Sequence, residues 1–373
     1  MVPKIPFALT PSGVLLNLYS ENMYGTWRNG SDEQISYTYR APALTLTVTR
    51  VSTGISASFT ATVSLPAPGT TVPAGGMPVL ISMHQGVSEA SANEEGFAVI
   101  TIDGFSIPVA SDNTEHNGAF YTLYPYRDDI PSEQTGVLMA WAWGCSKVLD
   151  ALFAGLANDL HIDPESAVVT GVSRWGKATL VCGAYDKRFR MVMPSCSGAG
   201  GVALFSYVSE GRTYDFSSKG GPDSYTYGRN EPLESLQAPG EQGWFNNRFL
   251  AYRTPDELPF DQHLLLTAIR NPNRALFIIG SCISEDWVNA PAMWYAYRKA
   301  KPYYDTEGLG DHIAINIHKE GHAVLDEDIR FMAGYFRYLF QNDAQTGDDF
   351  DLSRIQTSVF ELEQNRDPEM DPF

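Results

Sequence analysis

Basic residues are few for the length of this sequence. Its 373 residues include 26 lysines and arginines against 44 aspartates and glutamates, which gives a formal net charge of −18 at pH 7. A chain this acidic gains nothing from counterion release on a polyphosphate, so we expect no nucleic-acid partner. The same charge disfavours binding to an anionic membrane surface.

Long apolar runs and metal-binding patterns are also missing. We find no apolar run that looks long enough to span a bilayer, and residues 1–6 lack the apolar core of a signal peptide. Either the chain is intracellular or the sequence is a mature or excised segment. No group of His, Asp and Glu has metal-ligand spacing, so we expect neither a metal nor a cofactor.

Cysteine is scarce, with four in the whole chain. None lies at zinc-finger spacing and all have apolar neighbours, so small buried thiols are expected and the count does not indicate a redox compartment. These residues are Cys145, Cys182, Cys196 and Cys282.

The sequence does have a regular succession of strand and helix patterns. Residues 44–49 and 57–65 alternate in polarity and predict an antiparallel pair of strands. From about residue 78, apolar runs alternate with helical patterns, which predicts an α/β three-layer αβα sandwich with a mostly parallel sheet. We expect residues 1–342 to form a single catalytic domain. The acidic, aperiodic residues 343–373 predict a C-terminal tail or linker.

A serine stands at the turn between a predicted strand and a predicted helix. The β-branched run before Gly171 reads as a strand, Ser173 follows, and the helix begins near Lys177. A serine at the apex of such a turn projects above the sheet, and flanking glycines suit the strained backbone. Gly176 comes one residue later than in the Gly-x-Ser-x-Gly pattern. An ordinary turn with a helix-capping serine is therefore the alternative.

Two further polar groups follow predicted strands. One is Glu285 or its neighbour Asp286, and the other is His322. Ligands of parallel sheets bind at the carboxyl ends of the strands, and the chain order serine, acid, histidine is that of the α/β-hydrolases. The pattern predicts a serine hydrolase in which His322 takes the proton of Ser173 and a carboxylate orients the imidazole.

Several longer motifs point to one family. They are Ala-Trp-Ala-Trp-Gly at 140–144, Gly-Val-Ser-Arg-Trp-Gly-Lys at 171–177, Ser-Gly-Ala-Gly-Gly at 197–201, Glu-Gln-Gly-Trp-Phe at 241–245, Leu-Pro-Phe-Asp-Gln-His at 258–263, Asp-Trp at 286–287 and Gly-His at 321–322. From about residue 78 to residue 340, the sequence resembles the glucuronoyl esterases, carbohydrate esterase family fifteen, in its bacterial form. The resemblance implies an α/β-hydrolase fold and a secreted enzyme. Such an enzyme cleaves the ester between 4-O-methyl-glucuronic acid of glucuronoxylan and lignin alcohols.

The resemblance also implies roles for single residues. It places the nucleophile at Ser173, the base at His322 and an arginine that helps to hold the oxyanion at Arg174. It implies three contacts to the sugar, namely Lys177, Glu241 and Trp287. From the residues alone, Arg174 reads as a surface salt-bridge residue. The alternatives for the other two are a solvated first-turn lysine for Lys177 and a core residue for Trp287.

The sequence departs from the fungal members of the family at the acid. Cys196 stands where they carry a catalytic glutamate, and a thiol cannot orient a histidine as a carboxylate does. The acid must therefore come from residues 280–287. We favour Glu285, because some bacterial relatives have an acid two residues before the tryptophan. Asp286 stays the alternative, although it could equally cap a loop.

Other features of the family are absent or without a role. Fungal members bridge a cysteine just before the serine to one just after the histidine, and these positions are Val172 and Ala323 here, so that disulfide is missing. His84 and His263 are expected to be structural. No role is predicted for His116 and His318.

Two competing functions remain open. An acetyl or feruloyl xylan esterase would share the fold and the triad, but a neutral acyl pocket would not need Lys177, Glu241 and Arg174 together. A non-catalytic carbohydrate-binding protein would need no serine, acid and histidine at strand ends.

Overall fold

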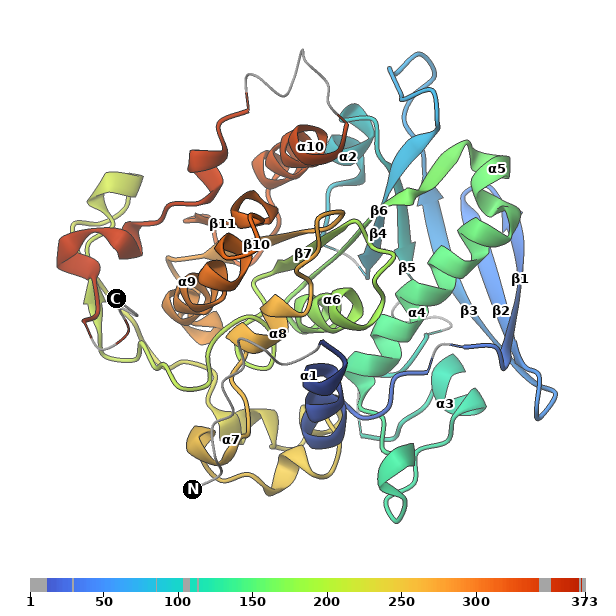
Figure 1. The fold of residues 1–373 in the computed structure, drawn as a ribbon, viewed down its shortest axis with the longest axis horizontal. Helices are drawn as coiled ribbons and strands as arrows, with labels where there is room; N and C mark the ends of the chain where they lie inside the picture. The colour runs from blue at the N-terminus through green and yellow to red at the C-terminus, as the bar shows by residue number, and fades with distance from the viewer. Residues whose placement is uncertain are drawn as a thin grey trace.

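The structure is a computed structural model that describes residues 12–28, 30–84, 86–102, 108–112, 114–341, 350–368 and 370. A nine-stranded sheet runs through the described chain in the order β1-β2-β3-β5-β4-β6-β7-β10-β11 (Figure 1). Its strands are β1 (Glu33–Arg40), β2 (Ala43–Arg50), β3 (Ile55–Ser64), β4 (Met77–Met83), β5 (Ala98–Ile102), β6 (Ile162–Val172), β7 (Met191–Ser195), β10 (Ala275–Ser281) and β11 (Ile313–His318).

The sheet changes from antiparallel to parallel along its width. Strands β1, β2, β3 and β5 pair antiparallel with their neighbours in that order. From β5 through β4, β6, β7 and β10 to β11, every neighbouring pair is parallel. The predicted mostly parallel sheet and the antiparallel pair β2–β3 are confirmed. The sequence pattern missed β1, whose burial alternates between half-buried and exposed residues.

Side-chain burial explains this change. Every residue of β4 and of β10 is buried, as expected for central parallel strands that are covered on both faces. In β2, by contrast, Leu44, Leu46 and Val48 are buried and the residues between them are partly exposed. That alternation is typical of a sheet with only one covered face.

Helices cover both faces of the parallel part and complete a three-layer sandwich. Leu80 of β4 packs into one apolar cluster with α2 and α10, while its neighbours Val79 and Ile81 pack into the other cluster with α4, α6 and α9. The predicted αβα arrangement is therefore confirmed. The helices are α1 (Ser12–Tyr19), α2 (Glu89–Glu94), α3 (Ala119–Leu123), α4 (Val137–Ala151), α5 (Ala157–Leu160), α6 (Arg174–Tyr185), α7 (Leu233–Leu236), α8 (His263–Thr267), α9 (Ala290–Asp305) and α10 (Asp326–Phe340).

One helical stretch, residues 137–160, corrects an expectation about apolar runs. It joins α4 and α5 through a π-helical turn, and its length and composition would suffice to cross a membrane. However, 83% of its most apolar 18-residue stretch is buried inside the protein. Lys147 in this helix forms ion pairs with Glu33 and Asp150. The stretch is thus the central helix of the core.

Long excursions leave the sheet at its carboxyl edge. The predicted loop 105–134 contains α3 and a 3₁₀ turn at Pro131–Glu133, while residues 105–107 and 113 lie outside the described part. Between β7 and α8, the chain forms α7 and a small hairpin of β8 (Thr213–Tyr214) and β9 (Tyr225–Thr226). These excursions supply the walls of the candidate site.

Residues 350–368 pack against the rest of the chain. Ile355, Val359 and Phe360 are buried, and Asp367 forms an ion pair with Arg212. The division at residue 342 stays a prediction, but this part of the predicted tail contributes to the core because its apolar side chains insert between α9, α10 and the β8–β9 hairpin. The four cysteines are buried and unbridged, as expected.

Candidate active site

Ser173 lies at a strained turn at the carboxyl end of β6. Its backbone has φ +63° and ψ −126°, a conformation that non-glycine residues rarely adopt, and its N–H donates to Ser195 O at 2.9 Å. Its side chain makes no capping hydrogen bond to α6. The alternative of a helix-capping serine is therefore wrong, and the strand–turn–helix arrangement has the geometry of a nucleophile elbow.

Two glycines allow the first turn of α6 to lie against the sheet. A Cβ on Gly171 would come within 2.8 Å of the Trp175 backbone, and a Cβ on Gly176 within 2.5 Å of Ser195 O. Side-chain atoms do not approach so closely, so both positions require glycine. The second glycine comes late because residue 176 is the one that faces β7.

His322 pairs with Glu285 in the predicted manner. His322 follows β11, Glu285 follows β10, and His322 Nδ1 lies 2.7 Å from Glu285 Oε2. The His322 side chain is 41% exposed, whereas that of Glu285 is 14% exposed. A carboxylate on Nδ1 holds the imidazole in the tautomer whose Nε2 can accept a proton.

Asp286, the alternative acid, is occupied elsewhere. The Tyr225 hydroxyl donates to its Oδ1 at 2.7 Å, and the Gly228 N–H donates to its Oδ2 at 2.9 Å. Both oxygens therefore hold the segment that follows β9, as a loop-capping residue does. Glu285, and not Asp286, contacts His322.

Cys196 contacts the backbone beside the histidine. Its Sγ lies 3.9 Å from Ala323 O, and its side chain is buried. Burial and the nearby charges of Glu285 and Asp328 raise the pKa of the Cys196 thiol. The thiol is thus neutral and weakly hydrogen-bonding at physiological pH, which agrees with an acid supplied from another strand.

Lys177 is buried, so the reading of a solvated first-turn lysine is wrong. Its Nζ donates to Ser197 O at 2.8 Å, to Ala199 O at 2.6 Å and to Glu231 Oε2 at 2.7 Å. An ammonium group has three N–H donors, so these three acceptors engage all of them. A direct bond from Lys177 to a sugar hydroxyl stays a prediction.

Glu231 is a site residue that the sequence analysis missed. Its side chain is 4% exposed, and its backbone N–H donates to Trp287 O at 2.9 Å. It therefore links the helix after Ser173 to the loop that carries Glu285 and Trp287. No motif marks it, since it lies in an aperiodic stretch and approaches Lys177 only through the fold.

Arg174 is held by a second residue that was missed, Asp112. Arg174 Nη1 donates to Asp112 Oδ2 at 2.6 Å, and Trp244 Nε1 donates to Asp112 Oδ1 at 2.7 Å. The Arg174 guanidinium also lies over the Trp244 ring at 5.3 Å, and its buried Nε has no partner among the described residues. Arg174 thus forms the salt bridge that the alternative interpretation predicted, and it directly follows Ser173 in the chain.

Glu241 and Trp287 differ in exposure. Glu241 Oε2 is buried without a partner among the described residues, and burial followed by the charge of Glu231 raises the pKa of Glu241. Trp287 is 42% exposed, so the core alternative is wrong, and the Arg229 guanidinium lies 5.8 Å from its ring centre. An exposed indole beside Glu285 can stack on a sugar ring.

The other singled-out histidines lie outside this cluster or support it. His84 is buried and its ring lies 4.4 Å from that of Trp175, which follows Ser173 closely. Burial lowers the pKa of His263 to about 4, as suits a structural histidine. Among the described residues, no group of three or more His, Cys, Asp and Glu side chains is placed to hold a metal ion.

The strand order and the residues at the strand ends define the class of protein. A parallel sheet with a serine elbow after β6, a carboxylate after β10 and a histidine after β11 is an α/β-hydrolase.

Comparison with known proteins narrows the class to a family. The sequence model of a family described as "Glucuronyl esterase, fungi" matches residues 48–308. A multidomain esterase of Ruminococcus flavefaciens is 53% identical over 360 residues, which are 95% of this chain and 46% of that protein. A 4-O-methyl-glucuronoyl methylesterase of Hypocrea jecorina is 32% identical over 271 residues, 72% of this chain and 52% of that protein. The solved structure of a family 15 glucuronoyl esterase from Caldicellulosiruptor kristjansonii matches with a TM-score of 0.81 and 34% identity, covering 95% of this chain and 91% of that chain.

The chain therefore belongs to the glucuronoyl esterase family, carbohydrate esterase family 15, as its motifs predicted. It spans about half the length of the curated relatives it matches.

Proposed function

We propose that this chain is a serine esterase that hydrolyses the ester between 4-O-methyl-glucuronic acid of glucuronoxylan and alcohols of lignin. The observation that carries the proposal is the His322–Glu285 contact of 2.7 Å after β11 and β10, in the same parallel sheet whose strand β6 ends at the strained Ser173. Family membership supports the acyl group, since the relative from Hypocrea jecorina is named a 4-O-methyl-glucuronoyl methylesterase.

The first step is acylation of Ser173. His322 Nε2 takes the proton of the Ser173 hydroxyl, and the oxygen attacks the ester carbonyl carbon of the uronate. The carbonyl oxygen becomes an oxyanion. Glu285 on Nδ1 stabilises the imidazolium that forms. The oxyanion then re-forms the carbonyl, the bond to the alcohol oxygen breaks, and His322 returns the proton to the leaving alcohol.

Water completes the cycle. It loses a proton to His322 while its oxygen attacks the acyl carbon of the glucuronoyl ester. The bond from that carbon to Ser173 Oγ then breaks, His322 returns the proton to Oγ, and the uronic acid leaves. Throughout, the oxyanion needs positive partners. Free N–H groups at the start of α6 and the guanidinium of Arg174 supply them, and one such donor contributes roughly 3 kcal/mol to the barrier reduction.

Residues around the Ser173 turn bind the sugar and determine the acyl specificity. The exposed ring of Trp287 offers a platform for the apolar face of the pyranose, and the half-buried carboxylate of Glu241 offers an acceptor for a hydroxyl. Lys177 supports this part of the pocket through Glu231, whose backbone bonds to Trp287. A neutral acetyl group would use none of these contacts, which favours a uronate over the acetyl and feruloyl alternatives.

A panel of esters tests the acyl specificity. Benzyl glucuronate should be hydrolysed with a far higher kcat/KM than benzyl galacturonate, methyl ferulate, p-nitrophenyl acetate or acetylated xylan. Equal rates on p-nitrophenyl acetate and benzyl glucuronate would overturn the uronate assignment. A preference for acetylated xylan or methyl ferulate would establish one of the competing esterases instead.

We also propose that the natural protein is secreted, because its proposed substrate is a plant-wall polymer outside the cell. Fractionation of the source organism, with activity on benzyl glucuronate as the readout, should find the protein in the culture medium or on the cell surface. Activity confined to the cytosol would contradict this.

A further inference from the structure

His318 is a histidine for which the sequence analysis predicts no role. It is the last residue of β11, and the loop that carries His322 begins directly after it. Its side chain is 8% exposed. A buried imidazole needs partners for its ring nitrogens, because an unpaired polar atom in the interior costs free energy.

Both ring nitrogens of His318 bind the backbone of the loop around His322. Nε2 lies 3.1 Å from Ala323 O, and the Glu320 N–H points to Nδ1 at 3.3 Å. A carbonyl can only accept and a backbone N–H can only donate, so these two contacts match the tautomer that carries a proton on Nε2. One imidazole thus fixes a backbone group on each side of His322.

Neighbouring side chains complete this anchorage. Ser281 Oγ accepts from the Gly321 N–H at 3.1 Å, and Asp328 Oδ2 accepts from the Leu325 N–H at 2.8 Å. The same Asp328 oxygen lies 3.6 Å from His318 Nε2, and Asp328 is fully buried. The loop is therefore tied to β10, β11 and α10, and His318 is the residue that holds it both before and after His322.

The exposure of His322 shows why such anchorage matters. Its side chain is 41% exposed and lies on a loop, so little packing restrains its ring. Its position relative to Glu285 and Ser173 depends on where the backbone of residue 322 is held. A displacement of a catalytic group by about 1 Å can cost about 100-fold in rate.

We propose that His318 is a positioning residue of this esterase, which holds the His322 loop through Glu320 N and Ala323 O and so keeps the His322 imidazole on Glu285, in position to take the proton of Ser173. The proposal rests on the proposed function, since His322 acts as the base there. His318 touches neither substrate nor Ser173 in this role.

Three substitutions separate the two hydrogen bonds. His318→Ala removes both. His318→Gln places an amide N–H near the position of Nε2 and can restore the bond to Ala323 O. His318→Asn places an amide oxygen near Nδ1 and can restore the bond from Glu320 N–H. Steady-state kinetics on benzyl glucuronate should show a kcat lowered by about 100-fold in His318→Ala, with KM changed by less than about twofold. His318→Gln and His318→Asn should each recover at least about tenfold of the loss.

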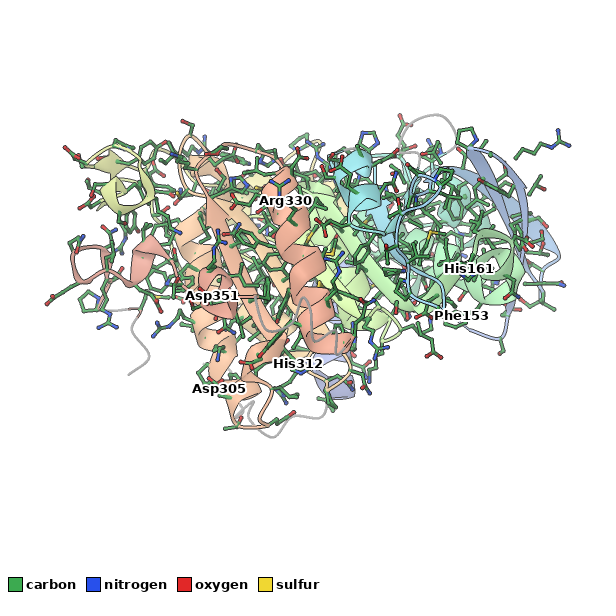
Figure 2. The ribbon with its side chains drawn as sticks, turned by 90° about the horizontal axis from the view of Figure 1, so that it is seen from above. Phe153, His161, Asp305, His312, Arg330 and Asp351 are labelled. Atoms are coloured by element: carbon green, nitrogen blue, oxygen red, sulfur yellow. The ribbon has the colours of Figure 1, made fainter. Side chains whose placement is uncertain are left out.

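His312 provides the matched control. It lies just before β11, and its Nδ1 is 2.7 Å from the backbone oxygen of Arg274. Figure 2 shows His312 toward the edge of the molecule opposite Arg330, which lies near the start of α10 and so near the His322 loop. His312→Ala should lower the thermal midpoint as His318→Ala does, but leave kcat within about twofold of the unsubstituted protein.

The outcomes are distinct. A His318→Ala kcat equal to that of the unsubstituted protein would overturn the proposal. A loss that neither Gln nor Asn relieves, or a loss that His312→Ala reproduces, would show a merely structural role and overturn it as well. Rescue by at least one of the two amides with KM unchanged would support it.

Labelling with a fluorophosphonate keeps this test separate from the substrate assignment, because the reagent reacts with an activated serine whatever the natural acyl group. If the unsubstituted protein is labelled at Ser173 but does not hydrolyse benzyl glucuronate, the proposed substrate is wrong. The labelling rates of the three His318 variants then take the place of kcat, with the same order expected and an equal rate for His318→Ala overturning the proposal.

Discussion

Glu285 Oε2 lies 2.7 Å from His322 Nδ1, while both oxygens of the adjacent Asp286 are bound to Tyr225 and Gly228. Adjacent carboxylates thus face opposite ways: one toward the imidazole and the other toward the segment after β9. This division supports the proposed catalytic role of Glu285 and a loop-holding role of Asp286, and the two roles can be separated by substitution.

Glu285→Gln should lower kcat on benzyl glucuronate by about 10⁴-fold, because an amide cannot stabilise the imidazolium and favours the wrong tautomer. Its stability should change little, because the amide has the size and shape of the carboxylate that it replaces. Asp286→Asn should cost much less activity. The reverse result, with Asp286→Asn crippling and Glu285→Gln nearly silent, would reassign the acid and leave the serine-hydrolase assignment intact.

Asp112 should fix the orientation of the Arg174 guanidinium. Asp112→Asn removes the charge that holds the Arg174 guanidinium beside Trp244, so the oxyanion partner loses its fixed orientation. We expect kcat to fall roughly tenfold with KM little changed. Asp129→Asn is the control, since Asp129 pairs with Arg127 in an exposed ion pair remote in chain position from the elbow. Equal effects of the two substitutions would show that the Asp112 pair has no special role.

The buried pair of Lys177 and Glu231 should matter for stability as well as for the site. Both side chains are 4% exposed, so Glu231→Gln leaves the ammonium of Lys177 without a buried counter-charge. Removal of one partner of such a pair costs about 3 kcal/mol of unfolding free energy. Urea unfolding of Glu231→Gln, compared with the exposed control Glu234→Gln, measures this. An unfolding free energy equal to that of the control would mean that the backbone acceptors alone satisfy Lys177.

Glu241 should make sugar binding pH-dependent. Burial and then the charge of Glu231 raise its pKa, so the carboxylate takes up a proton at a higher pH than an ordinary glutamate, whose pKa is about 4.3. As pH falls through this raised pKa, the charged acceptor becomes a neutral carboxylic acid, which accepts a hydrogen bond from a sugar hydroxyl less strongly, so binding weakens. Calorimetry with methyl glucuronate and the Ser173→Ala protein should show this weakening, free of turnover. A Glu241→Gln, Ser173→Ala protein with the same pH profile would contradict the assignment.

The strands and the pair of Glu285 and His322 were predictable because they depend on local patterns. Continuous apolar runs marked β4, β6 and β10, and the residues that follow β10 and β11 meet because parallel strands share one carboxyl edge. The late position of Gly176 departed from the elbow pattern, and only its contact with Ser195 of β7 explains it.

What the sequence did not reveal depends on contacts between distant segments. Asp112 and Glu231 lie in aperiodic stretches, and only the fold brings them to Arg174 and Lys177. The burial of Lys177 was missed for the same reason, since two of the carbonyls that accept its hydrogen bonds come from the turn after β7. The apolar length of helix 137–160 was underestimated, because charged residues such as Lys147 interrupt it in the sequence and find ion-pair partners only in the folded core.

The account is tested most directly by kcat/KM for benzyl glucuronate, measured on the unsubstituted protein, Ser173→Ala and His322→Ala. We predict ready turnover by the unsubstituted protein and a loss of about 10⁶-fold in kcat in each variant, with the two losses not additive because serine and histidine act as a unit. Folded variants, verified by unchanged circular dichroism, that retain the turnover of the unsubstituted protein would contradict a nucleophilic Ser173 activated by His322.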